Sequence, residues 1–166
     1  RYHDPRRFGC LIFSETLTNH NLLSKLGPEP LTEYFDHQYL FNQLQKRKAT
    51  IKQLIMDNQI VVGVGNIYAC ESLFLSKISP LRFGNTITQQ ECNTLVDNIK
   101  QVLQQAIELG GSSLRDYRDA NGELGYFQQN HFVYAHADEP CKICSSIIQE
   151  IRLGQRNSFY CPSCQK

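Results

Sequence analysis

Two cysteine pairs near the end of the chain, Cys141-Lys142-Ile143-Cys144 and Cys161-Pro162-Ser163-Cys164, decide how the last quarter of the sequence folds. Two Cys-x2-Cys pairs at this separation are typical of one tetrahedral Zn²⁺ site. The sixteen residues between the pairs, 145–160, are enough for a β-hairpin and too few for a separate core. We therefore predict one structural Zn²⁺ with four thiolate ligands, which leaves no open position for catalysis at the metal.

An arginine, Arg156, lies inside the predicted hairpin. Zinc that fixes the hairpin also fixes the direction of this side chain. A protruding guanidinium is suited to bidentate binding of phosphate. The alternative is that Arg156 is an ordinary surface residue.

The composition is that of a folded domain with a real core and without a strong charge bias. The 166 residues are 41% hydrophobic and carry a formal net charge of +1. No apolar run approaches the ~18 residues of a membrane span, so we expect no membrane association. The polar first residues do not resemble a signal peptide, which favours a reducing compartment and metal binding over disulfides. The three isolated cysteines are interpreted as small buried hydrophobes: Cys10, Cys70 and Cys92.

The rest of the chain divides into a strand-like start and a helical middle. Residues 1–16 are predicted as strand material because 8–13 is a short apolar run without helical period. Asp36 is expected to cap a helix to about residue 48, and Thr50 one over 51–56. A further helix begins near residue 67, and Thr88 with Glu91 forms a capping box for a long amphipathic helix that ends at 110–111. The polar segment 112–131 is predicted to be a functional loop.

The string Gly63-Val64-Gly65-Asn66 interrupts the helical pattern. Two glycines allow a tight turn, and a helix beginning at Asn66 would present free N–H groups to a phosphate. The third glycine of a dinucleotide-binding fingerprint is absent. From spacing alone, a helix-turn-helix turn capped by Asn66 is the preferred interpretation.

Two basic clusters carry similar alternatives. Lys46, Arg47 and Lys48, with Lys52 nearby, form either a phosphate-binding patch or a solvated helix end. Arg6-Arg7-Phe8 could read base edges and insert a ring into a base stack, or could be a surface pair beside a core aromatic. Each cluster alone favours the structural interpretation. Together with Asn66 and Arg156 they have nucleic acid as their economical common partner.

Several strings, in order along the whole chain, resemble bacterial formamidopyrimidine-DNA glycosylases. They are Asp4-Pro5-Arg6-Arg7-Phe8-Gly9, Gly27-Pro28-Glu29-Pro30-Leu31, Met56-Asp57-Asn58, Val62-Gly63-Val64-Gly65-Asn66-Ile67-Tyr68-Ala69, Glu71-Ser72-Leu73-Phe74, Gly125-Tyr126-Phe127, Gln155-Arg156 and Phe159-Tyr160-Cys161-Pro162. The resemblance implies a mostly α fold with small β: a helix-two-turns-helix domain and a C-terminal β-hairpin zinc finger, preceded by strands left from an N-terminal β-sandwich. It places the end of the first lobe and a linker at 1–27, the helical domain with a lesion-capping loop at 28–131, and the zinc finger at 132–166.

The function implied by the resemblance is base-excision repair. The family removes 8-oxoguanine and formamidopyrimidines from damaged double-stranded DNA after flipping the base out of the stack. It then cleaves the abasic site by β,δ-elimination, using an N-terminal proline as Schiff-base nucleophile and an adjacent glutamate as acid/base. The resemblance also implies a monomer of the bacterial cytoplasm, associated with the nucleoid and not with a membrane.

Residue by residue, the resemblance assigns DNA binding to Arg6, Phe8, Lys48, Lys52, Asn66 and Arg156. Arg6 matches the contact to the cytosine opposite the lesion, and Phe8 the ring that fills the stack. Asn66 matches the asparagine on the lesion's phosphate. Arg156 matches the finger arginine that binds the phosphates of the abasic site and is the catalytic proton donor in δ-elimination.

The sequence departs from the family pattern in three places. The Pro-Glu start and a first-lobe lysine are absent, as if roughly a hundred residues preceded Arg1, so we expect these 166 residues alone to be inactive in base excision. Ala135-His136 stands where Gly-Arg is common, and Ser145 where a glycine is common. Two other hypotheses remain: an isolated, non-catalytic DNA-binding fragment, and a zinc ribbon used for protein contacts.

Overall fold

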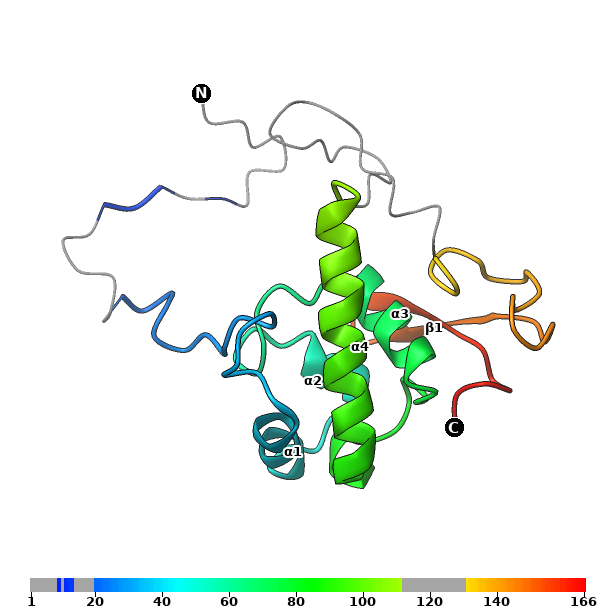
Figure 1. Ribbon diagram of the computed structural model, residues 1–166, viewed down its shortest axis with the longest axis horizontal. Coiled ribbons are helices and arrows are strands. Elements are labelled where there is room, and N and C mark those ends of the chain that lie inside the picture. Colours follow the sequence, from blue (N-terminus) through cyan, green and yellow to red (C-terminus); the bar gives the residue numbers. More distant parts are fainter. Residues whose placement is uncertain (1–8, 10, 14–19, 112–130) are drawn as a thin grey trace.

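Helices dominate the regular structure of the computed structural model, which describes residues 9, 11–13, 20–111 and 131–166 (Figure 1). This confirms the predicted fold class of a mostly α chain with a small C-terminal β-hairpin. The elements in chain order are α1 (His37–Gln45), α2 (Ile51–Ile55), α3 (Asn66–Leu75), the 3₁₀ turn η1 (Gly84–Thr86), α4 (Gln89–Glu108), β1 (Gln149–Leu153) and β2 (Arg156–Tyr160).

Side chains at the predicted caps begin two of the helices. The Asp36 carboxylate accepts a hydrogen bond from the backbone N–H of Tyr39 at 2.7 Å. At the start of α4, the Thr88 backbone N–H donates to the Glu91 carboxylate at 2.8 Å while the Glu91 N–H donates to the Thr88 hydroxyl. This reciprocal pair is the predicted capping box, and it satisfies donors that a helix start leaves free.

Two helix boundaries differ from the prediction. Helix α1 ends at Gln45, three residues before the predicted end near residue 48, and Lys46 is its C-cap. Helix α3 has Gly65 as its N-cap, with Asn66 as the first helical residue. The predicted cap role of Asn66 is therefore wrong, because its side chain forms hydrogen bonds to other parts of the fold instead.

Helix α4 is the centre of the main hydrophobic core. It lies between α1 on one side and α3 on the other, and α2 lies behind it (Figure 1). The amphipathic pattern of α4 explains this position, since its apolar residues recur at helical spacing and are buried. The core they join consists of fully buried side chains from all four helices and the connecting loops, among them Phe35, Leu40, Leu44, Ile51, Ile55, Ile60, Leu73, Leu95 and Ile99.

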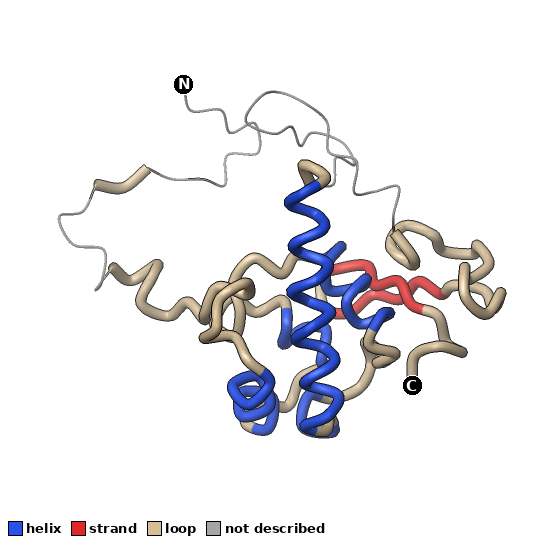
Figure 2. Tube along the Cα trace, viewed as in Figure 1, coloured by secondary structure: helices blue, strands red, loops and turns tan. Residues whose placement is uncertain are grey.

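A second, smaller core joins α3 to the zinc finger. The antiparallel strands β1 and β2 pack beside α3 (Figure 2). Cys70 and Phe74 of α3 are buried among finger residues in this cluster, which also contains Val133, Cys141, Ile148, Phe159 and Cys161. Since one helix contributes to both cores, the finger and the helical domain share a continuous apolar interior.

The strand predicted near the start is not formed where the chain is described. Leu11, Ile12 and Phe13 are not in a strand, and Leu11 and Phe13 are more than nine-tenths exposed. A strand needs a neighbour to satisfy its backbone, and no strand of the described ranges pairs with these residues. Residues 1–8, 10 and 14–16 of that segment and the loop 112–130 lie outside the described residues. Among the described helices, none combines the length and apolar character needed to cross a membrane.

Two finger residues, at positions where the family resemblance predicts glycine, adopt the left-handed backbone region. Ala135 has φ 64° and Ser145 has φ 61°. A residue with a Cβ is destabilised there by about 1–2 kcal/mol, partly offset by the lower chain entropy it has when unfolded. We expect Ala135→Gly and Ser145→Gly each to raise the free energy of unfolding by about 0.5–1 kcal/mol, measured by denaturant titration at fixed zinc concentration.

The control for this prediction is Ala137→Gly, two residues from Ala135. Ala137 is not among the residues with positive φ, so the same change should lower stability by about 0.5–1 kcal/mol. Equal effects at positions 135 and 137 would contradict the backbone explanation.

Candidate nucleic-acid interface and metal centre

The four predicted cysteine ligands converge on one point of the finger. The sulfur atoms of Cys141, Cys144, Cys161 and Cys164 all lie within 4.8 Å of one another. Cys144 Sγ is 3.4 Å from Cys161 Sγ, and Cys141 Sγ is 3.9 Å from Cys164 Sγ. Zn–S bonds of ≈2.3 Å in a tetrahedron place sulfurs about 3.8 Å apart. The donor set therefore fits one structural Zn²⁺, held by one pair of ligands before the hairpin and one pair after it.

The pairing of the two strands determines which side chains face the helical domain. Arg156 is opposite Leu153, and Arg152 is opposite Asn157. Because side chains alternate along a strand and paired residues share a face, Arg156 and Ser158 are on one face and Arg152 on the other. The Ser158 hydroxyl contacts Lys52 of α2. The face that carries Arg156 is thus the one turned toward α2.

Lys52 is at the centre of the contact between α2, α3 and β2. Its ammonium donates to the Asn66 side-chain oxygen at 2.6 Å, to the Ser158 hydroxyl at 2.6 Å and to the Asn157 carbonyl at 3.2 Å. Only 1% of the residue is exposed. Burial lowers the pKa of Lys52, an effect that the neighbouring Cys70 opposes. Lys52, predicted as a DNA contact, is enclosed by protein here and links α2 to α3 and β2.

Asn66 is fixed at both ends of its side chain. Its oxygen accepts from Lys52, and its nitrogen donates to the Asn157 carbonyl of β2 at 3.0 Å. The preceding turn depends on Gly63, whose φ is 78°. A Cβ added at Gly63 or Gly65 would meet nothing within 4 Å. The start of α3 is therefore open to a bulky group, with Asn66 held in place beside it.

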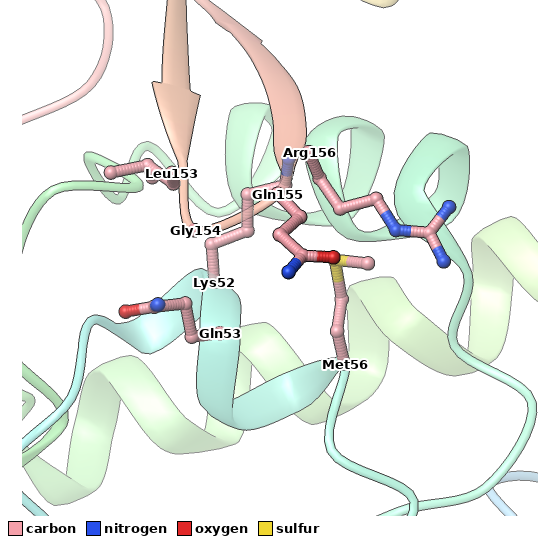
Figure 3. Close-up of a pocket in the computed structure, with 7 residues that line it drawn as sticks. All are labelled: Lys52, Gln53, Met56, Leu153, Gly154, Gln155 and Arg156. Carbon is pink, nitrogen blue, oxygen red and sulfur yellow. The ribbon is translucent and has the colours of Figure 1, made fainter.

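A cavity of about 170 Å³ lies between α2 and the hairpin turn (Figure 3). Lys52, Gln53 and Met56 line it from the helical side and Leu153, Gly154, Gln155 and Arg156 from the finger. In Figure 3 the Arg156 guanidinium extends away from the hairpin turn, while the Gln155 side chain lies near Met56. The cavity marks the junction where the finger arginine and the helical domain present polar groups together.

The other predicted contacts are not gathered into this junction. Lys48 is exposed in the connection between α1 and α2, as is Lys46 at the end of α1. Their charges are available to a polyanion without a protein partner being displaced. Arg6 and Phe8 lie outside the described residues.

Sequence reasoning missed two side chains that hold the finger against the helices. The Glu71 carboxylate of α3 accepts three hydrogen bonds from backbone N–H groups of residues 132–134. Gln165 donates to the Ile78 carbonyl at 2.9 Å and accepts from the Cys161 N–H at 2.8 Å. One signal was available for Glu71: it is the sole ionisable carboxylate within the apolar run 69–75, which packs on two cores.

Two family models match the chain. The model described as the formamidopyrimidine-DNA glycosylase H2TH domain matches residues 26–118. The zinc finger found in FPG and IleRS matches residues 138–166. The first match covers α1 to α4, and the second covers the hairpin with all four cysteine ligands.

The chain is also similar to curated proteins and solved structures. It is 52% identical to the formamidopyrimidine-DNA glycosylase of Vibrio vulnificus strain CMCP6 over 99% of the chain and 61% of that relative, and 51% identical to that of Neisseria meningitidis over 100% and 61%. The structure of MutM (Fpg) from Thermus thermophilus superposes with a TM-score of 0.90 at 40% identity, covering 98% of this chain and 63% of that one. Lactococcus lactis Fpg in complex with abasic-site DNA superposes with a TM-score of 0.80 at 39% identity, covering 87% of this chain and 53% of that one.

The chain thus spans about 61% of the length of the curated relatives that it matches. Within that span the helices, the hairpin and the four-cysteine cluster agree with one architecture. The chain belongs to the formamidopyrimidine-DNA glycosylase family.

Proposed function

We propose that the full-length protein is a DNA glycosylase of base-excision repair that removes oxidised purines, 8-oxoguanine and formamidopyrimidines, from duplex DNA. We further propose that it cleaves the resulting abasic site by β,δ-elimination. The proposal is supported by family membership and by relatives whose solved structures are described as complexes with abasic-site DNA and with carbocyclic 8-oxo-G containing DNA. We propose the division 1–27, 28–131 and 132–166, a monomeric state, and a place in the bacterial cytoplasm at the nucleoid.

The observation that carries the DNA-binding part is the junction of α2, α3 and β2. Asn66 at an open helix start and Arg156 on the finger come from segments ninety residues apart, yet Lys52 and Asn66 both bind the carbonyl of Asn157, the residue next to Arg156 in β2. A helix start and a guanidinium both bind phosphate well. In this proposal Asn66 and Arg156 hold neighbouring phosphates at the lesion, and Lys48 adds a contact along the backbone. Arg156 is the catalytic residue of this chain, acting in δ-elimination.

The zinc has a structural part in this proposal. With four thiolate ligands it offers no site for an activated water, so the chain's own side chains and the proposed N-terminal proline must do the chemistry. Arg6 and Phe8 are proposed to contact the opposite strand and the base stack.

A second candidate is that these 166 residues by themselves bind DNA without catalysis, because Asn66 and Arg156, the phosphate-binding groups of the junction, both lie within them. Borohydride trapping on an abasic-site duplex separates the two activities. A protein that carries the proline nucleophile is expected to cross-link, whereas the 166-residue chain is expected to bind the duplex without cross-linking. A cross-link to the 166-residue chain would refute the assignment of the nucleophile, and absence of binding would refute the proposed interface.

A further inference from the structure

Glu71 is a buried carboxylate whose hydrogen-bond partners are backbone amides. The residue is 2% exposed. Its Oε2 accepts from the Phe132 N–H at 2.8 Å, and its Oε1 from the N–H groups of Val133 at 3.1 Å and Tyr134 at 2.8 Å. Neither ion pair of the described part of the chain includes it. Glu71 therefore joins α3 to the first residues of the finger by a carboxylate surrounded by three donors.

This arrangement requires the ionised carboxylate. Burial raises the pKa of Glu71, and the three amide N–H groups act against that rise. An ionised carboxylate offers only acceptors, which matches three N–H donors. A protonated acid or a glutamine would direct one of its own hydrogens at a donor, so the identity of the residue is constrained by the backbone that it binds.

The segment held by Glu71 is connected to the strand that carries Arg156. Phe132 stacks on Phe74 of α3 with ring centroids 5.4 Å apart. Tyr134 packs edge-to-face against Phe159 of β2 at 5.0 Å. Phe159 is three residues along β2 from Arg156. A change in the position of residues 132–134 on α3 would thus be transmitted, through these ring contacts, to the strand that carries Arg156.

Contacts of Lys52 and Glu71 contribute to the orientation of β2 relative to the helices. Lys52 binds the strand at Asn157 and Ser158, and Glu71 fixes the segment that packs on Phe159. The four cysteine ligands, by contrast, all belong to the finger, so a metal held there would connect finger residues only to one another. The zinc shapes the finger, while contacts to α2 and α3 decide how the finger is placed on the helical domain.

We propose that Glu71 is a positioning residue for DNA binding, which places the finger on α3 so that Arg156 meets the phosphates presented beside Asn66. The inference rests on the proposed function, because it acts through the contact of Arg156 with DNA. It assigns to Glu71 an effect on affinity although its carboxylate is buried.

The test is a double-mutant cycle on zinc-loaded protein with an abasic-site duplex. Glu71→Gln should weaken binding roughly tenfold, since it loses a charge-assisted bond and introduces a clash of donors. In an Arg156→Ala background, Glu71→Gln should change the affinity for the duplex less than twofold. Glu108→Gln, on an exposed carboxylate near the end of α4, is the matched control and should leave the affinity unchanged.

The outcomes separate this inference from the proposed function. If Arg156→Ala leaves the affinity unchanged, the proposed DNA contact fails. If Arg156→Ala weakens binding but Glu71→Gln does not, or if the two losses multiply, the positioning role of Glu71 is refuted. If Glu71→Gln releases zinc, the cycle is carried out with Glu71→Asp, which keeps the charge and shortens the reach. A zinc-loaded Asp variant with wild-type affinity would then refute the inference.

Discussion

Loss of the metal should disorder the finger and lower the affinity for an abasic-site duplex about hundredfold, because Arg156 and its supporting strand are no longer held in place. Cys144→Ser is the sharpest way to test this, since Cys144 is exposed and its replacement removes a ligand without altering buried packing. The finger should lose its amide dispersion in an NMR spectrum. The apolar face of α3, with Cys70 and Phe74, should become exposed to solvent.

Ile143→Ala is the matched control for the metal. Ile143 lies next to Cys144 and is 66% exposed, so the variant should retain one zinc per chain and bind DNA like the wild type. Unchanged DNA affinity in zinc-free Cys144→Ser protein would contradict the claim that the metal is needed to place Arg156.

Replacing Lys52 by methionine should lower both the stability of the protein and its affinity for DNA. The variant keeps the aliphatic stem but leaves the Asn66 oxygen and the Ser158 hydroxyl without their 2.6 Å donor. We expect a loss of about 2–3 kcal/mol in the free energy of unfolding, which is typical when buried partners of a charged group are left unpaired. DNA affinity should fall about tenfold as Asn66 loses its restraint. Denaturant titration and fluorescence anisotropy measure the two effects.

Lys48→Met separates stability from binding. Lys48 is exposed, so its loss should change the free energy of unfolding by less than about 0.5 kcal/mol. It should nevertheless make the slope of log K for DNA binding against log salt concentration shallower by about 0.9, the value for one lost phosphate contact. If Lys52→Met behaved like Lys48→Met in both measurements, the buried network would not be what holds α2, α3 and β2 together.

Local signals explain what could be predicted from the sequence. The capping box of Thr88 and Glu91 spans four residues, and the cysteine pairs span four residues each, so spacing is enough to recognise them. The hairpin follows from the sixteen residues between the pairs. These features depend on neighbours in the sequence, and the structure confirms them.

Long-range partners explain what could not be predicted. The burial of Lys52 depends on Asn157 and Ser158, which are 105 and 106 positions away in the sequence. Glu71 binds the amides of residues 132–134, which are 61 to 63 positions away. A lysine in a basic cluster resembles a surface lysine until its partners are known. The sequence predicts Asn66 as a cap because a helix begins there. Its side chain instead binds Lys52 and the Asn157 carbonyl, which no local pattern records.

We expect one face of the finger hairpin, carrying Arg156, to act with the start of α3 as a DNA-binding surface. Arg152 provides the matched comparison, because it has the same charge, is exposed in the same hairpin and is on the opposite face. The most direct measurement is the affinity of zinc-loaded Arg156→Ala and Arg152→Ala proteins for an abasic-site duplex at two salt concentrations. Arg156→Ala should weaken binding at least about tenfold and lower the salt slope by about one, whereas Arg152→Ala should change affinity less than about twofold. Equal losses for the two variants would contradict the assignment of a single DNA-binding face.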